Sequence, residues 1–411
     1  MTGARYLIGD VFERMGELPD GSVDLILTSP PFLALRSYLP ADHPDKSKEI
    51  GSEATPAVFV DTLLRLTAEW RRLLAPYGSL CVELGDTYSG SGGAGGDYGP
   101  NGMRDGQARF GGTARLAAEA KRTGSGAGWP LAKSLALTPE LYRVALAYGI
   151  HPLTGEQSPA GQWRVRNVVR WVRRNPPPGA LGDKWRPATS TMVVACTASN
   201  RYWDEVATRT PYSDNTHPRV ASGASPRFDL RSQQRDGNWA TLGQENNPDD
   251  GPGAPLLDWW EISPGGYTGS HYAVWPPELC GPPIKAMTPE RVCVECGEPS
   301  RRITETTQVD TGRTTNGKKN NGRKFETAID YPTRTVAAVE TLGWTDCGHN
   351  NWRSGLVLDP FAGSGTTLAV ATGLGRDAIG IDIDERNADL AVERVGGLFL
   401  AVDRPDGETR R

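Results

Sequence analysis

The chain has 411 residues, enough for one large domain with insertions or for two, and its net charge of −4 gives no global sign of a polyanionic partner. No apolar signal segment opens it, no run reaches membrane-spanning length, and six cysteines in so long a chain do not resemble a disulfide framework. We therefore expect a cytoplasmic protein with reduced thiols and no membrane partner.

The first ninety residues alternate apolar runs that predict strands with segments that predict helices. The expected elements are strands at 5–10 and 23–27, a strand with its polar loop at 78–88, and helices at 11–18 and 59–74. The first strand ends in Asp10, and the second leads into Thr-Ser-Pro-Pro-Phe at 28–32. Because ligands bind at the carboxyl ends of strands in open parallel sheets, we expect a site there.

Residues 89–112 include ten glycines among 24 residues, a composition that predicts no packed structure. They form either a flexible linker or a mobile loop that becomes ordered over a substrate. Downstream, a helix is expected over 135–147 and a buried strand over 191–196. Residues 206–270 contain few apolar runs and predict no regular layer of a sheet.

A basic stripe runs along the imperfectly alternating strand expected at 164–176, with tryptophans between its charges. Such a stripe is more often a solvated face, but aromatic residues beside basic ones favour contact with phosphates. The residues proposed for this contact are Arg164, Arg166, Arg170, Arg173, Arg174 and Lys184, interleaved with Trp163, Trp171 and Trp185.

Two pairs of metal-ligand residue types stand about fifty residues apart, Cys293-x-x-Cys296 and Cys347-x-His349. Three thiolates and one imidazole satisfy tetrahedral zinc, and because the protein fills all four positions the metal is expected to be structural. The alternative is a set of unrelated buried thiols and a surface histidine. Between the pairs lies a polar loop with several basic residues, which a zinc ion would close at its base.

Residues 357–367 predict a strand, a tight small-residue turn and a helix that begins at about Thr366. Glycines at 363 and 365 allow close approach of the backbone to a ligand, and the helix N-terminus offers free N–H groups. A second strand at 377–382 ends in Asp382, 23 positions after Asp359, where a carboxylate takes the hydroxyls of a ribose. These features predict a nucleoside cofactor without separating NAD from S-adenosylmethionine.

The run Asp-Pro-Phe-Ala-Gly-Ser-Gly-Thr-Thr at 359–367 resembles the cofactor motif of the S-adenosylmethionine-dependent DNA amino-methyltransferases. Residues 271–279 resemble the segment of that family that lines the methionine end of the cofactor. The resemblance implies that S-adenosylmethionine is bound by Asp10, Thr28, Trp275, Pro276, Asp359, Pro360, Phe361, Gly363, Ser364, Gly365, Thr366 and Asp382.

The order of the motifs, with the catalytic motif before the cofactor motif, resembles the β-type arrangement of this family. After the helix expected at 385–395 the chain supplies no further predicted strand, so we expect the strand at 5–10 to take the next place in the sheet. Asp10 then lies near the adenine of the cofactor. The expected fold is α/β, a circularly permuted Rossmann-like methyltransferase sheet with inserted loops and a small zinc-binding insertion.

The Ser-Pro-Pro-Phe segment suits an exocyclic amine as the nucleophile. Hydrogen bonds from its two protons to the Ser29 hydroxyl and the Pro30 carbonyl direct its lone pair towards the methyl group. Pro31 keeps that carbonyl rigid, and Phe32 can stack on a base turned out of the duplex. Methylation at carbon 5 needs a cysteine nucleophile, which in that family follows a proline, and no Pro-Cys pair occurs here.

Serine at the first motif position resembles the cytosine-N4 enzymes, so we predict a cytosine-N4 methyltransferase acting on duplex DNA. Adenine-N6 methylation stays open, because a hydroxyl accepts a hydrogen bond from either amine. Two other classes also stay open, a catalytically inert DNA-binding protein and an RNA or protein-glutamine methyltransferase, although Asn-Pro-Pro is expected in the last. The resemblance further implies a homodimer, and a restriction–modification system in which any endonuclease is a separate chain.

The domain prediction follows the motifs. It places the catalytic half at 1–88, a flexible loop that orders over DNA at 89–128, the remainder of the catalytic half at 129–205, a target-recognition segment at 206–270, and the cofactor-binding half at 271–411, with the zinc insertion at about 290–350.

Overall fold

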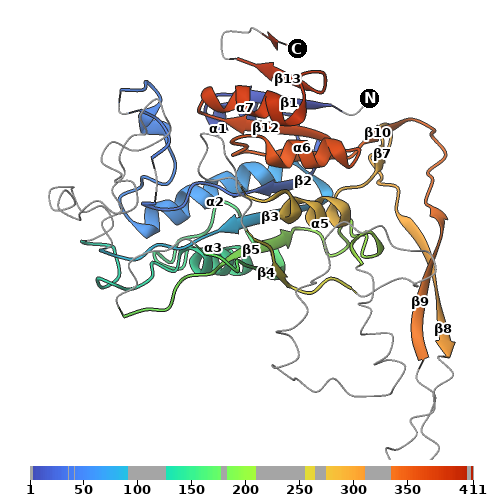
Figure 1. Cartoon of the computed structure of the whole chain (residues 1–411), viewed down its shortest axis with the longest axis horizontal. Helices are drawn as coiled ribbons and strands as arrows, with labels where there is room; N and C mark the ends of the chain where they lie inside the picture. The colour runs from blue at the N-terminus through green and yellow to red at the C-terminus, as the bar shows by residue number, and fades with distance from the viewer. Residues whose placement is uncertain are drawn as a thin grey trace, which may run out of the picture. The chain divides into compact units, whose positions relative to one another are not determined.

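The computed structural model describes residues 3–35, 37–40, 42–90, 126–176, 183–209, 255–263, 275–310, 335–404 and 409–410 (Figure 1). The chain divides into two compact units, the larger formed by residues 1–203, 257–299 and 349–411. Most of the predicted glycine-rich loop, most of the predicted recognition segment and residues 311–334 of the basic loop between the two cysteine pairs lie outside the described residues.

The larger unit contains a ten-stranded sheet in the order β14-β13-β1-β12-β11-β2-β3-β5-β4-β6 (Figure 1). Its strands are β1 Ala4–Ile8, β2 Val23–Thr28, β3 Leu74–Leu84, β4 Arg164–Val172, β5 Thr189–Cys196, β6 Trp259–Glu261, β11 Leu356–Asp359, β12 Asp377–Asp382, β13 Leu400–Asp403 and β14 Thr409–Arg410. The six strands from β13 to β3 run parallel, whereas β5 is antiparallel to both β3 and β4.

The N-terminal strand β1 lies beside β12, with Ile8 opposite Asp382, and this pairing confirms the place predicted for it. The prediction that no strand follows the last helix was wrong. β13 pairs with the other side of β1, and β14 pairs with β13. The sequence signal was weak because β13 has four residues, of which only Leu400 and Val402 are buried.

Helices cover both faces of this sheet. They are α1 Val11–Gly16, α2 Pro56–Leu73, α3 Thr138–Tyr148, α5 Pro277–Met287, α6 Thr366–Gly373 and α7 Arg386–Val395. The helices α1, α2 and α3 pack side by side, as do α5, α6 and α7. Two short 3-10 turns are η1 Lys46–Lys48 and η2 Val206–Thr208.

The longest of these helices shows why the chain folds this way locally. Thr55 caps α2 by accepting from the N–H of Val58, a proline opens its first turn, and arginines lie in its last turn, where cations suit the helix dipole. Its apolar face buries Phe59, Leu63 and Trp70 in the main core with side chains from β2 and β3.

A buried carboxylate ties three strands of the sheet together. Asp24 in β2 is fully buried and pairs with Arg353 at 2.7 Å. It also accepts from the Tyr77 hydroxyl at 2.6 Å and from the N–H of Leu356 at 2.7 Å. The strands β2, β3 and β11 therefore share one polar anchor inside an otherwise apolar core.

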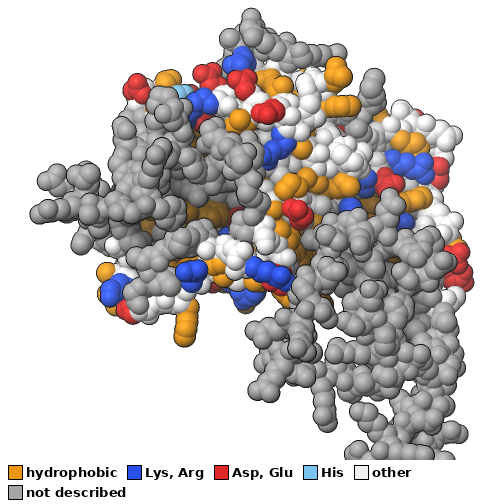
Figure 2. All heavy atoms as spheres, in the orientation of Figure 1, with side chains coloured by type: hydrophobic (Ala, Val, Ile, Leu, Met, Phe, Trp, Pro, Cys, Tyr) orange, Lys and Arg blue, Asp and Glu red, His pale blue; other side chains and the backbone are white. Residues whose placement is uncertain are grey.

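A small sheet of β7 Arg291–Cys293 and β10 Trp352–Ser354 also belongs to the larger unit. The second unit contains the antiparallel hairpin of β8 Arg302–Asp310 and β9 Thr335–Trp344, together with an ion pair of 2.9 Å between Arg302 and Asp204. On the face in Figure 2, basic and acidic side chains of the described residues are interspersed. Among the described helices, none combines the length and apolarity that a membrane crossing requires.

Candidate active site

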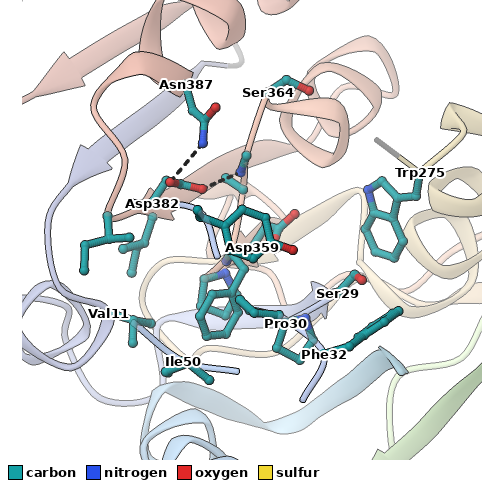
Figure 3. Close-up of a pocket in the computed structure, with 18 of the residues that line it drawn as sticks. Val11, Ser29, Pro30, Phe32, Ile50, Trp275, Asp359, Ser364, Asp382 and Asn387 are labelled. Atoms are coloured by element: carbon teal, nitrogen blue, oxygen red, sulfur yellow. Dashed lines mark hydrogen bonds between the residues drawn. The ribbon is translucent and has the colours of Figure 1, made fainter. Parts of the chain in front are cut away.

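A cavity of about 300 Å³ opens at the carboxyl edge of the parallel strands, and residues that directly follow β1, β2, β11 and β12 line it (Figure 3). The predicted site residues that it brings together are Asp10, Ser29, Pro30, Pro31, Phe32, Trp275, Asp359, Pro360, Phe361, Gly363, Ser364, Thr366 and Asp382. Thr28, Pro276 and Gly365 are not among the lining residues.

Asp382 presents a half-buried carboxylate to this cavity. It accepts from the N–H of Gly363 at 2.8 Å, the N–H of Asp384 at 2.8 Å and the side-chain amide of Asn387 at 3.1 Å (Figure 3). Burial raises the pKa of Asp382 to about 6, although these hydrogen bonds oppose the rise. Among the described residues, only Gly363 donates to Oδ2, so that oxygen keeps room for a hydroxyl donor from a ligand.

Asp359 holds the turn between β11 and α6 in shape. Its carboxylate accepts from the hydroxyls of Thr28 at 2.7 Å and Thr367 at 2.6 Å and from the N–H of Phe361 at 3.1 Å. Burial raises its pKa to about 6, against the effect of these donors. Thr28, expected at the cofactor, lies behind the cavity wall and supports Asp359.

The two glycines of the turn have different roles. Gly363 lines the cavity with φ of 50°, and its carbonyl accepts from the Tyr6 hydroxyl at 2.6 Å. Gly365 has φ of 76°, and a Cβ there would stand 2.9 Å from the Cβ of Ala391 in α7. We expected both glycines to admit a ligand, whereas Gly365 instead allows α6 and α7 to approach each other.

Asp10 lines the cavity and also begins α1. One oxygen of its carboxylate accepts from the N–H groups of Phe12 at 3.0 Å and Glu13 at 3.1 Å, which satisfies two free donors of the first turn. The cap fixes the carboxylate at the end of β1, which β12 and β11 separate from β2 and the Ser-Pro-Pro-Phe segment.

The catalytic segment brings in a residue that the sequence analysis missed. The Ser29 hydroxyl donates to Glu83 Oε2 at 2.6 Å, and both side chains line the cavity. Glu83 is buried in β3, so desolvation raises its pKa, against the effect of the nearby Ser190 and Ser29 hydroxyls and the charge of Arg173. The available signal was a lone acid inside the apolar run at 80–84.

Phe32 lies beside Ser29 and Pro30 at one side of the cavity, opposite Asp382 and Asn387 (Figure 3). Its ring rests on the backbone of Gly85, where an added Cβ would stand 2.5 Å from Cε2 of the ring. The position directly after β3 therefore requires glycine if the ring is to keep this orientation.

The basic stripe divides between the two ends of β4. Arg164 and Arg166, opposite the end of β5, donate to backbone carbonyls of residues 197–199, at the edge away from the cavity. At the cavity edge, Arg174 pairs with Glu261, and the ammonium group of Lys184 lies 3.3 Å from the centroid of the Tyr88 ring.

Arg173 was also expected among the DNA-contacting residues, but its surroundings differ from those of the other arginines in the stripe. Arg173 lines the cavity together with Trp171, over whose ring its guanidinium lies 4.8 Å from the centroid. Of the three tryptophans in the stripe, Trp163 and Trp171 are buried, whereas Trp185 is 95% exposed.

The predicted metal ligands come together. One ligand atom from each of Cys293, Cys296, Cys347 and His349 lies within 4.8 Å of the other three, and Cys293 Sγ is 3.5 Å from Nδ1 of His349. The turn at Cys293 is shaped by backbone bonds, in which the N–H of Gly297 donates to the Cys293 carbonyl at 3.0 Å. The donor set fits a tetrahedral, thiolate-rich metal centre.

Comparison with known proteins finds a family profile and relatives that are all described as DNA methylases or type II methyltransferases. The N6/N4 methylase profile, described as DNA methylase, matches residues 23–296 and 346–393. The type II methyltransferase M.SfiI of Streptomyces fimbriatus is 27% identical over 225 residues, 53% of this chain and 42% of that protein. M.Cfr9I of Citrobacter freundii, another type II methyltransferase, is 23% identical over 408 residues, 98% of this chain and 91% of that protein.

A solved structure titled PvuII DNA methyltransferase (cytosine-N4-specific) is similar with a TM-score of 0.48 and 13% identity, over 96% of this chain and 86% of that one.

Proposed function

This chain belongs to the N6/N4 DNA methylase family of S-adenosylmethionine-dependent DNA methyltransferases, and from that premise we propose that it methylates the exocyclic N4 of a cytosine turned out of duplex DNA. The observation that carries the proposal is the hydrogen bond of 2.6 Å from Ser29 to the buried Glu83 inside the cavity. Because the serine proton points to Glu83, the lone pairs of Ser29 Oγ are left to accept a proton of the amine.

The cofactor residues form one side of the cavity. S-adenosylmethionine, when bound, supplies a methyl group activated by its sulfonium. The half-buried Asp382 carboxylate is proposed to accept from the ribose, Asp10 to lie near the adenine, and Trp275 to line the methionine end. In the part of the chain that the structure describes, Asp382 Oδ2 accepts from Gly363 alone, which supports a ligand with hydroxyl donors.

The catalytic residues then act on the amine. Because Ser29 gives its own proton to Glu83, its lone pairs are free to accept one proton of the amine, and the Pro30 carbonyl accepts the other. As the nitrogen bonds to the methyl carbon and the carbon–sulfur bond breaks, the nitrogen must lose a proton. Ser29 takes it and passes its own proton to Glu83, whose raised pKa suits it to hold one.

Cytosine is favoured over adenine by the serine of the Ser-Pro-Pro-Phe motif, which resembles the cytosine-N4 enzymes. The competing assignment, adenine-N6, uses the same residues and proton path, so the identity of the base is the part that needs measurement. Phe32, held against Gly85, is proposed to stack on the extruded base.

The test is to express the protein in a host that lacks DNA methylation and to digest the genomic DNA to nucleosides for mass spectrometry. N4-methylcytosine is expected with the wild-type protein and with a Ser22→Ala control, and none is expected with Ser29→Ala. N6-methyladenine would overturn the base, and equal product from Ser29→Ala would overturn the role of the serine.

We further propose the finer fold class, a circularly permuted Rossmann-like methyltransferase sheet. The position of the N-terminal β1 between β12 and β13 supports it. We propose that duplex DNA contacts Arg170, Arg174 and Lys184 of the basic stripe. Arg164 and Arg166 are left out of this proposal because they lie at the edge of the sheet away from the cavity. A second copy of the chain and a separate endonuclease remain predictions from the resemblance.

A structural zinc ion is proposed for the cluster of Cys293, Cys296, Cys347 and His349. The proximity of their ligand atoms supports it, and with four protein ligands no position remains for a catalytic water. We expect one zinc per chain by elemental analysis of the purified protein, and loss of that zinc together with a lowered Tm for Cys296→Ser. A metal-free wild-type protein with an unchanged Tm would contradict the assignment.

A further inference from the structure

Arg173 differs from the other arginines of the basic stripe because it faces the cavity. It directly follows β4, and its N–H donates to the carbonyl of Ala188 at 2.8 Å, which continues the pairing of β4 with β5. β5 in turn pairs with β3, the strand that contains Glu83. This pairing brings Arg173 to the same cavity as Glu83, Ser29 and Phe32.

The guanidinium of Arg173 is held by its face and not by its edge. It stacks on Trp171, whose indole N–H donates to the carbonyl of Ile262 at 2.8 Å and is thereby fixed. Stacking leaves the in-plane N–H groups of a guanidinium available. Among the described residues, Arg173 Nε is buried and has no hydrogen-bond partner.

A buried donor without a partner is costly, and here the charge is also partly desolvated. Burial lowers the pKa of Arg173, whereas the nearby Glu83 opposes that change. No ion pair joins Arg173 to Glu83 among the described residues, although Glu83 lines the same cavity and its charge acts on Arg173. The described residues also leave the terminal N–H groups of this half-buried side chain without an acceptor, so a fork of two parallel donors is unfilled at the cavity.

The two candidate bases differ on the edge that such a fork would meet. Beside the amine, cytosine presents two adjacent acceptors, N3 and O2, whereas adenine presents N1 and then a C–H group. Two adjacent acceptors match the two parallel donors of a guanidinium. We propose that Arg173 is a specificity-determining residue that binds N3 and O2 of the extruded cytosine and disfavours adenine.

This inference rests on the proposed function, since it requires that the cavity receive a cytosine whose amine is at Ser29. It also changes the role of Arg173 from the phosphate contact expected from the sequence. A phosphate contact needs only a positive charge, whereas the recognition of two acceptors needs the fork. The two roles therefore separate on replacement of arginine by lysine.

The experiment first maps the bases that the wild-type protein methylates in genomic DNA. Two duplexes with one such site are then made. One has cytosine at the target. The other has an analogue that keeps the amine and the adjacent ring nitrogen but lacks the acceptor O2, because hydrogen replaces the 2-oxo group. Single-turnover rates are measured over at least about four decades for the wild type, Arg173→Gln and Arg173→Lys, together with calorimetric affinities for S-adenosylmethionine. Arg65→Gln, an exposed arginine of α2, is the matched control.

We expect the wild type to methylate the analogue about 10- to 100-fold more slowly than cytosine, the usual range for one paired contact to a base edge. Arg173→Gln and Arg173→Lys should methylate cytosine more slowly by a similar factor and show no further loss on the analogue. Their affinity for S-adenosylmethionine and their Tm should equal those of Arg65→Gln.

Several results would overturn the inference. One is methylation of cytosine by Arg173→Gln at the wild-type rate, and another is a wild-type rate in Arg173→Lys. A third is a loss of affinity for S-adenosylmethionine as large as the loss of rate. The fourth is a preference for cytosine over the analogue that is undiminished in both variants. A wild-type rate on the analogue below detection would also count against it, because one contact cannot account for so large a loss. If the wild-type product is N6-methyladenine, it is the proposed function that fails.

Discussion

Glu83 is the residue on which the proposed proton movement depends. Its Oε2 accepts the Ser29 proton at 2.6 Å, and its pKa is raised because β3 buries it. Glu83→Gln keeps the size of the side chain but removes the proton acceptor.

We expect Glu83→Gln to lower the single-turnover methylation rate by about 100-fold, the low end for loss of a general base, with unchanged affinity for S-adenosylmethionine. Glu69→Gln, which changes a surface carboxylate in α2, is the control. A wild-type rate in Glu83→Gln would remove Glu83 from the mechanism.

Asp382 should make the affinity for S-adenosylmethionine depend on pH, and the direction of that dependence follows from the burial of its carboxylate. Its pKa in the cofactor-free protein is raised to about 6, so the carboxyl is protonated and a poorer acceptor below that pH. Hydroxyl donors favour the charged form, so binding of S-adenosylmethionine is strongest above pH 6 and weakens as the pH falls through that value. A decrease of about tenfold in affinity is expected between pH 7 and pH 5.

Isothermal titration calorimetry over that range measures the change. Asp382→Asn should bind more weakly at pH 7 and lose most of the pH dependence, whereas a pH profile equal to that of the wild type would show that another group titrates. Asp359 has a similarly raised pKa, but its partners are protein groups, so Asp382→Asn separates the two.

At the scale of the element, the end of β3 positions the Phe32 ring. Gly85 has no room for a Cβ, which would stand 2.5 Å from the ring. We expect Gly85→Ala to displace the ring, lower the free energy of unfolding by about 1–3 kcal/mol and reduce methylation more than Gly16→Ala, a position with nothing within 4 Å. Urea denaturation and nucleoside analysis measure the two effects, and normal methylation by Gly85→Ala would argue against a fixed Phe32.

The elements that the sequence predicted well are those with a strong apolar pattern. The helices at 59–74 and 385–395 and the strands at 23–27 and 377–382 correspond to α2, α7, β2 and β12 with shifts of a few residues at their ends. β13 was missed because a strand of four residues with two buried side chains gives almost no periodic signal.

The site residues also fall into those that the sequence could predict and those that it could not. Residues close together in the sequence, such as those at 359–366, could be predicted as a group because one turn positions them. Glu83 and Arg173 could not. Glu83 reaches Ser29 through the parallel pairing of β2 with β3, and Arg173 reaches it only through the further antiparallel pairing of β5 and β4, and the register of such pairs is not written in the local sequence of any one strand.

For the molecule as a whole, Asp24 is the polar group whose loss should cost most. It is fully buried and bonded to Arg353, Tyr77 and Leu356. Asp24→Ala leaves the arginine charge half-buried without a partner, and we expect a decrease of about 3–5 kcal/mol in the free energy of unfolding.

Asp20→Ala removes a carboxylate from an exposed ion pair with Arg72 and should cost at most about 1 kcal/mol. Equal midpoints for the two variants in urea would show that the buried anchor does not hold the sheet together.

The position of β1 also has a consequence for biosynthesis. Ile8 is opposite Asp382, and Ala4 is opposite both Ala378 and Leu400, so the ribosome adds the neighbours of the first strand long after the strand itself. Until residues 377–403 leave the exit tunnel, β1 has no sheet partner and the wall of the cavity that contains Asp10 and Asp382 does not exist. A nascent chain whose residues 377–403 are still in the tunnel therefore cannot bind S-adenosylmethionine at this wall of the cavity.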